Sequence, residues 1–128
     1  MPNYMLLLYT PTAGPPSPDD PGMDISRWRA FRRGLVESGM LVAEGRLPTT
    51  DVATTVRIRD DETLITDGPF ADTKEYLAGF FMLDCPDLDT ALEAAARVPN
   101  VHYGTVEIRP TMDLTPFQSE DEPAQAQT

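Results

Sequence analysis

Two uninterrupted apolar runs constrain the fold more than any other feature of this sequence. The first spans residues 4–9 (YMLLLY) and is followed by Thr10-Pro11, and the second spans residues 76–84 (YLAGFFMLD). Continuous rather than alternating hydrophobicity is typical of a short strand that is covered on both faces. We therefore expect both runs to be central strands of one sheet. Gly79 in the second run indicates a bulge or a close approach by another group.

Capping residues predict two helices around these strands. Asp24 can cap a helix that runs to about Ser38, and Asp87 can cap a second helix that ends at Val98-Pro99. Alternating patterns and turn residues predict four more strands, at residues 41–44, 54–59, 63–66 and 105–109. The pair at 54–66 should form a hairpin with its turn at Asp60-Asp61.

This element order predicts an α+β fold, the ferredoxin-like plait with an inserted β-hairpin. Its sheet has four antiparallel strands, with both helices on one face. The other face would stay uncovered, although the two central strands are apolar on both faces. Soluble monomers rarely expose so large an apolar patch. We therefore expect a homodimer that packs sheet against sheet, as a dimeric α/β barrel. The domain should span residues 1–114, and residues 115–128 read as a polar acidic C-terminal tail.

Composition narrows the partners that this domain can have. The 128 residues include 21 acidic side chains against 10 lysines and arginines, for a formal charge of -11. Nucleic acid and anionic membranes would repel such a chain, so neither is an expected partner. One cysteine excludes an internal disulfide and favours a reducing cytoplasm. The N-terminal apolar run has no basic leader and is too short to span a membrane, which also favours a cytoplasmic location.

A polar corner lies between the predicted hairpin and the second apolar run, at residues 66–75 (TDGPFADTKE). Gly68 tolerates positive φ and Pro69 stiffens the bend, while Phe70 should be a buried anchor. The corner then presents four charged side chains at reproducible positions: Asp67, Asp72, Lys74 and Glu75. Such a corner is typical of a binding site and equally typical of a well-built structural turn.

Two further stretches allow a functional and a structural interpretation. Residues 10–22 (TPTAGPPSPDDPG) form a loop that either walls a pocket or is a plain surface excursion. Four arginines of the first helix form either an anion-binding patch or a solvated face: Arg27, Arg29, Arg32 and Arg33.

The last strand leads to a hypothesis about the site. Glu107 and Arg109 alternate with Val106 and Ile108, so they should point to the dimer side of the sheet if the apolar pair faces the helices. Charges held there need partners. We expect them to join the corner in one polar cluster, within a subunit or across the two-fold axis, that contacts any ligand: Asp67, Lys74, Glu75, Glu107 and Arg109.

Several of these stretches together resemble one known family. Residues 4–7, 67–75, 79–81 and 106–110 are similar, in order, to the YCII-related family, and in it to the subgroup with an Asp-Gly-Pro-Phe (DGPF) signature. The resemblance implies a ferredoxin-like fold that dimerises as an α+β barrel, with biochemical function mostly unassigned. It also implies a functional link to an extracytoplasmic-function sigma factor, and the wider family includes a few relatives that are small-molecule lyases or dehalogenating enzymes.

The resemblance does not supply a catalytic pair. Catalytic proposals for the wider family use a histidine of the first helix with an aspartate, but the only histidine here, His102, precedes the last strand. The corner carboxylates or Glu107 could act as a general base, and Lys74 or Arg109 could bind an anion. A carboxylate beside a cation is usually a weak base in a structural salt bridge. Catalytic residues thus stay unknown.

No metal or other cofactor is expected, because no His or Cys cluster joins Asp72 and Glu75, and Cys85 has no basic neighbour that would activate it. The favoured function is a dimeric small-molecule-binding or regulatory protein. Its pocket would lie between sheet and helices, with residues 10–22 as wall and the corner as floor. The alternatives are a lyase- or hydrolase-like enzyme acting on a small anionic or aromatic compound, and a purely structural dimerisation module.

Overall fold

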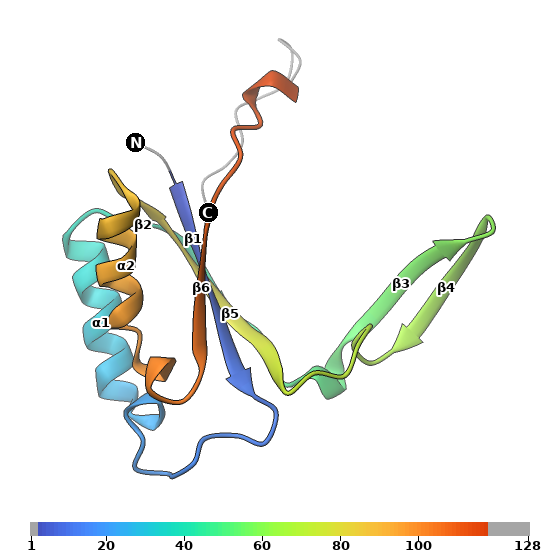
Figure 1. The fold of residues 1–128 in the computed structure, drawn as a ribbon, viewed down its shortest axis with the longest axis horizontal. Helices are drawn as coiled ribbons and strands as arrows, with labels where there is room; N and C mark the ends of the chain where they lie inside the picture. Colours follow the sequence, from blue (N-terminus) through green and yellow to red (C-terminus); the bar gives the residue numbers. More distant parts are fainter. Residues whose placement is uncertain (1–2, 118–128) are drawn as a thin grey trace.

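The computed structural model describes residues 3–117, which form a four-stranded antiparallel sheet, two α-helices and a separate β-hairpin (Figure 1). Four strands pair in the order β2-β5-β1-β6: β1 (Asn3–Pro11), β2 (Leu41–Arg46), β5 (Glu75–Asp84) and β6 (Thr105–Pro110). This antiparallel order, with the two longest apolar strands in the centre, is that of the ferredoxin-like plait. The predicted α+β fold is confirmed.

The helices begin at the residues that the sequence indicates. In α1 (Ile25–Glu37) the N-cap Asp24 accepts a hydrogen bond from the backbone N–H of Ser26, and in α2 (Leu88–Ala96) the N-cap Asp87 accepts one from the N–H of Thr90. Short 3-10 turns complete the described chain: η1 (Pro21–Met23), η2 (Thr50–Val52), η3 (Pro99–His102) and η4 (Thr115–Phe117). The predicted tail begins in η4, and its residues 118–128 lie outside the described residues.

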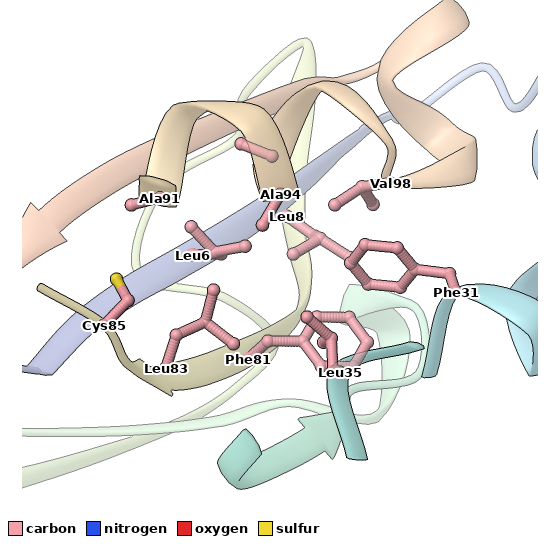
Figure 2. Packing of buried hydrophobic residues seen from close by; sticks show 11 residues of the cluster. Leu6, Leu8, Phe31, Leu35, Phe81, Leu83, Cys85, Ala91, Ala94 and Val98 are labelled. Atoms are coloured by element: carbon pink, nitrogen blue, oxygen red, sulfur yellow. The ribbon is translucent and has the colours of Figure 1, made fainter. Parts of the chain in front are cut away.

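The core lies between the sheet and the two helices (Figure 2). Alternate residues of β1 and β5 point toward the helices, where the rings of Phe31 and Phe81 meet edge to face with their centroids 5.2 Å apart. Three alanines of α2 let that helix lie close to the sheet. The buried cluster consists of Leu6, Leu8, Phe31, Leu35, Phe81, Leu83, Cys85, Ala91, Ala94, Ala95 and Val98.

The opposite face of the sheet is also apolar. Met5 pairs with Met82, and Leu7 pairs with Phe80, in the register of β1 with β5. These four side chains alternate with core residues and therefore point away from the helices. Both helices lie on the other side of the sheet (Figure 1), so neither covers this open face, which we define as Met5, Leu7, Phe80 and Met82.

The inserted hairpin extends away from the body of the subunit on the side opposite the helices (Figure 1). It consists of β3 (Thr54–Arg59) and β4 (Glu62–Asp67), joined by Asp60 and Asp61 at φ 51° and 62°. The predicted hairpin and its turn are confirmed. One hairpin face is apolar and solvent-exposed in the single subunit, and we define it as Val56, Ile58 and Ile65.

Candidate ligand pocket

A cavity of about 610 Å³ opens between the helix-covered face of the sheet and α1, near the end of the sheet where β1 leaves and β5 begins. We call it the sheet-end pocket. Leu8 and Phe81 form part of its apolar lining from the sheet, and Trp28 contributes from α1. Polar side chains that line it include those of Arg46, Tyr76 and Tyr103.

A β-bulge decides which side chains reach this pocket. The register of β1 with β5 shifts between Leu8 and Tyr9, so that Ala78 of β5 has no partner on β1. A bulge of this kind reverses the alternation of side chains beyond it. Tyr76, opposite Thr10, therefore lies on the helix-covered side and lines the pocket.

The close approach of two strands explains the glycine beside the bulge. A Cβ atom built on Gly79 would lie 2.7 Å from the carbonyl oxygen of Gly45 in β2, which is too close for any side chain. Both features that the sequence suggested at Gly79, a bulge and a close approach, are confirmed next to it. This tight contact brings Arg46, the last residue of β2, to the edge of the pocket.

The proline-rich loop is one wall of the pocket and is anchored at both ends. Gly14, Pro15 and Gly22 line the cavity. At one end, Thr12 donates two hydrogen bonds of 2.7 Å to the corner, from its N–H to the carbonyl of Lys74 and from its hydroxyl to that of Thr73. At the other end, the indole N–H of Trp28 donates to the carbonyl of Gly22 at 2.7 Å.

Tyr103 closes the pocket beside this loop. Its ring packs so closely on Gly22 that a Cβ atom there would collide with the ring. Burial raises the pKa of Tyr103, the negative charge of Asp20 and the neighbouring Tyr76 raise it further, and Arg46 offsets part of the effect. The phenol is therefore protonated at neutral pH and can donate a hydrogen bond.

The pocket lining carries positive charge in an acidic protein. Three arginines and one glutamate line it: Arg29, Arg32, Arg46 and Glu44. Nε of Arg32 lies 2.8 Å from Oε2 and 3.0 Å from Oε1 of Glu44, so these two charges compensate each other. Within residues 3–117, the side chains of Arg29 and Arg46 have no hydrogen bond or ion pair. Among the four arginines of the first helix, Arg32 is paired with Glu44 and Arg27 with Asp24 at 3.7 Å.

The residues predicted to form one polar cluster are divided within the subunit, because the pair of Glu107 and Arg109 lies away from the corner. Arg109 pairs with Glu107 at 3.1 Å, and the hydroxyl of Thr105 donates to Glu75 at 3.1 Å. Along β1, Arg109 is opposite Met5 and Glu75 is opposite Pro11, a separation of roughly 20 Å at the rise of a strand. A contact across a two-fold axis stays a prediction. Asp67 and Lys74 are exposed, and all five predicted residues lie outside the lining of the sheet-end pocket.

The corner at residues 66–75 instead fixes backbone positions. Gly68 has φ 104°, its N–H donates to the carbonyl of Ala53 at 2.6 Å, and its own carbonyl accepts from the hydroxyl of Thr55 at 2.7 Å. The expectation that Phe70 is buried is wrong for the single subunit, because its side chain is 76% exposed. The guanidinium of Arg57 lies 6.0 Å from the centre of the Phe70 ring.

Other candidate groups lie away from the sheet-end pocket. His102 is exposed and lines a second cavity, between α1 and η3, together with Arg27 and Arg97. Cys85 is in the core, where burial raises its pKa. Within residues 3–117, no three His, Cys, Asp or Glu side chains gather closely enough to hold a metal ion, and no helix is long and apolar enough to cross a membrane.

Comparison with known proteins gives a family and no activity. Residues 27–115 match the YCII-related domain. An uncharacterized protein of Rhizobium meliloti (strain 1021) is 45% identical over 83 residues, which cover 63% of this chain and 67% of that protein. The matched region contains most of α1, the hairpin, the corner and β5, and it includes Trp28, Arg46, Tyr76 and Tyr103 of the sheet-end pocket.

Proposed function

The chain belongs to the YCII-related family, and from this premise we propose that it is a homodimeric small-molecule-binding protein of a regulatory kind. Residues 67–70 (Asp-Gly-Pro-Phe) support its assignment to the DGPF subgroup. A cytoplasmic location fits a single cysteine that is buried as a free thiol. A catalytic role has less support, because His102 lines the other cavity.

The sheet-end pocket is the observation that carries this proposal. Its volume of about 610 Å³ is that of a small-molecule site. The loop that walls it is tied to the corner by Thr12 and to α1 by Trp28. The pocket combines an apolar lining with a few polar groups, as ligand sites do.

The apolar surfaces opposite the helices support the dimer. The open face of the sheet (Met5, Leu7, Phe80 and Met82) and the hairpin extend on the same side of the subunit (Figure 1). A second copy with its sheet against the open face would cover it and would also reach the apolar face of the hairpin. One two-fold interface would thus bury two surfaces that the subunit alone leaves in water.

Sedimentation velocity tests the dimer. At micromolar concentration we expect the wild type to sediment as a species with twice the 14.1 kDa mass of the chain. Leu7→Glu places a charge in the open face and should give monomers or aggregates. Val36→Glu, a change at a half-exposed position of α1, is the control and should leave the dimer intact. A compact wild-type monomer would overturn the dimer.

Ligand binding is tested separately, by a thermal-shift screen with small carboxylates and phenols. Thr10→Phe adds a ring to the pocket lining and should abolish any stabilisation that a compound gives to the wild type. Thr66→Phe, at an exposed position on the hairpin face opposite Val56, Ile58 and Ile65, should keep the full shift. Equal shifts in wild type and Thr10→Phe would place binding outside the sheet-end pocket.

A further inference from the structure

We propose that the sheet-end pocket selects a small organic monocarboxylate with an apolar, preferably aromatic, body. Arg46, with Tyr76 and Tyr103 beside it, holds the carboxylate, and the body lies against Leu8, Trp28 and Phe81. This inference rests on the proposed function and names the ligand class for the same site.

The side chain of Arg46 brings a positive charge to the pocket. Within residues 3–117 its guanidinium has no hydrogen bond or ion pair, although the whole chain carries a formal charge of -11. The one carboxylate among the described residues that lines the cavity, Glu44, is paired with Arg32, so the donors of Arg46 remain available to a ligand. The planar guanidinium matches a carboxylate with two parallel hydrogen bonds.

The neighbours of Arg46 favour one negative charge over two. Tyr76 and Tyr103 line the same pocket, and the Tyr103 hydroxyl is close enough to interact with both Tyr76 and Arg46. The field of Asp20 also reaches the Tyr103 hydroxyl. One guanidinium and two phenols at this end can compensate one negative charge on a ligand, whereas a second negative charge there would have no cation of its own.

Apart from Arg29, the other side of the pocket offers little to a polar ligand. Leu8 and Phe81 are buried core residues whose edges form its lining. The indole N–H of Trp28 is already bonded to the carbonyl of Gly22, so the ring presents apolar surface to the cavity. Arg32 is neutralised by Glu44. A molecule with an anionic end and an apolar end therefore matches the pocket at both ends.

Arg29 is the competing anchor for the carboxylate, because it also lines the pocket and its side chain has no ion pair within the described chain. It lies on α1, whereas Arg46 lies at the end of β2, where its charge reaches the Tyr103 hydroxyl. The proposal assigns the carboxylate to Arg46, so Arg29 contributes only through its long-range field. Both arginine side chains are exposed, and their replacement by glutamine should leave folding unchanged.

The experiment is isothermal titration with benzoate, phenylacetate and phenylpropionate, each compared with its neutral amide, and with phenyl phosphate as the dianion. We expect at least one acid to bind the wild type about tenfold or more tightly than its amide and than phenyl phosphate. A tenfold preference over the amide is about what a hydrogen bond to a charged group contributes to binding. Arg46→Gln should remove most of the preference of the protein for acid over amide, and Arg29→Gln should change the affinity by about threefold or less. Unchanged circular dichroism and melting temperature show that both variants fold.

The outcomes separate this inference from the proposed function. Three results would reject a monocarboxylate as the ligand class and keep the pocket as a small-molecule site. They are equal binding of acid and amide, tighter binding of phenyl phosphate, and an Arg46→Gln variant with wild-type selectivity. Selectivity lost in Arg29→Gln but kept in Arg46→Gln would overturn the assignment to Arg46. If none of these compounds binds, the monocarboxylate is also rejected, and the proposed function then depends on the wider thermal-shift screen.

Discussion

The side-chain hydroxyl of Thr12 donates a hydrogen bond of 2.7 Å to the backbone carbonyl of Thr73, which is 61 residues further along the chain. The N–H of Thr12 makes a second bond of 2.7 Å, to the carbonyl of Lys74. These two bonds hold the proline-rich wall of the sheet-end pocket against the corner at residues 66–75. The corner thus supports the pocket through its main chain, while the charges that make it prominent in the sequence point elsewhere.

Thr12→Val should loosen this wall. The variant keeps the shape of the side chain and the N–H bond but removes the hydroxyl, at a cost of about 0.5–1.5 kcal/mol in the free energy of unfolding. We expect faster proteolysis within residues 10–22 and weaker ligand binding. Thr111→Val removes a hydroxyl that donates to the carbonyl of Asn3 at 3.2 Å, away from the pocket, and should leave binding unchanged. Equal binding by both variants would contradict a supporting role for Thr12.

Gly68→Ala tests the backbone of the corner. Gly68 has φ 104°, and no atom lies within 4 Å of the position that a Cβ atom would take. The cost is therefore conformational only, about 1 kcal/mol or more in the free energy of unfolding. Gly34→Ala is the matched control, because its site is equally open but helical, and it should stabilise the protein by up to about 1 kcal/mol. A wild-type denaturant midpoint for Gly68→Ala would show that the corner is unstrained.

The fold was readable from the sequence because its signals are local. Asp24 and Asp87 cap the helices in isolation from the rest of the chain, and the two apolar runs need only their own composition to mark them as central strands. The topology then follows from the order of the elements. Phe70 shows the limit of such reasoning, because its exposure depends on what else is near it.

The candidate site was not readable, because it depends on register and close contacts. Tyr76 reaches the pocket only because Ala78 is bulged out of the pairing with β1. The sequence indicated the irregularity through Gly79 but not the side chain that it redirects. Arg46 and Tyr103 lie far apart in the chain and meet through the tertiary fold alone. The conspicuous charges are used otherwise: Arg109 pairs with Glu107, Glu75 accepts a hydrogen bond from Thr105, and Asp67 and Lys74 are exposed.

Gly79→Ala should be more damaging than Gly68→Ala. The new Cβ would lie 2.7 Å from the carbonyl oxygen of Gly45, and a backbone atom in a paired strand cannot easily move away. Overpacking of this kind costs about 1–3 kcal/mol in the free energy of unfolding. Because β2 must shift, Arg46 should also move and ligand binding should weaken. Urea denaturation and titration of one ligand would check both effects, and unchanged values would show that β2 and β5 separate at little cost.

The N-cap of α2 should make stability depend on pH. Hydrogen bonds from the hydroxyl and N–H of Thr90 lower the pKa of Asp87 below its ordinary value of 3.8. The carboxylate therefore contributes stability above pH 3.8, the value for an unfolded chain, and this contribution is lost as the pH falls through the lower folded pKa. Asp87→Ala should lower the melting temperature at neutral pH, by an amount that shrinks as the medium becomes more acid. Glu93→Gln, a change on the same helix away from the N-cap, is the control. Its melting temperature should not differ from that of the wild type in this pH-dependent way.

The apolar face of the hairpin should belong to the dimer interface. Val56 and Ile65 pair across β3 and β4 and are 64% and 70% exposed in the subunit, so neither stabilises the isolated fold much. Ile65→Lys should therefore leave the monomer folded. If a second copy covers this face, the same change should weaken dimerisation by tenfold or more, roughly the effect of one charge at an apolar contact.

Thr66→Lys is the control, because Thr66 lies on the opposite face of β4 and is also exposed. Sedimentation at a series of concentrations should show dissociation of Ile65→Lys where wild type and Thr66→Lys remain dimers. The melting temperature of Ile65→Lys should also depend more strongly on concentration, because dimerisation stabilises only the folded chain. Equal dimer stability in all three proteins would place the hairpin face outside the interface, and the open face of the sheet would then have to hold the two subunits together alone.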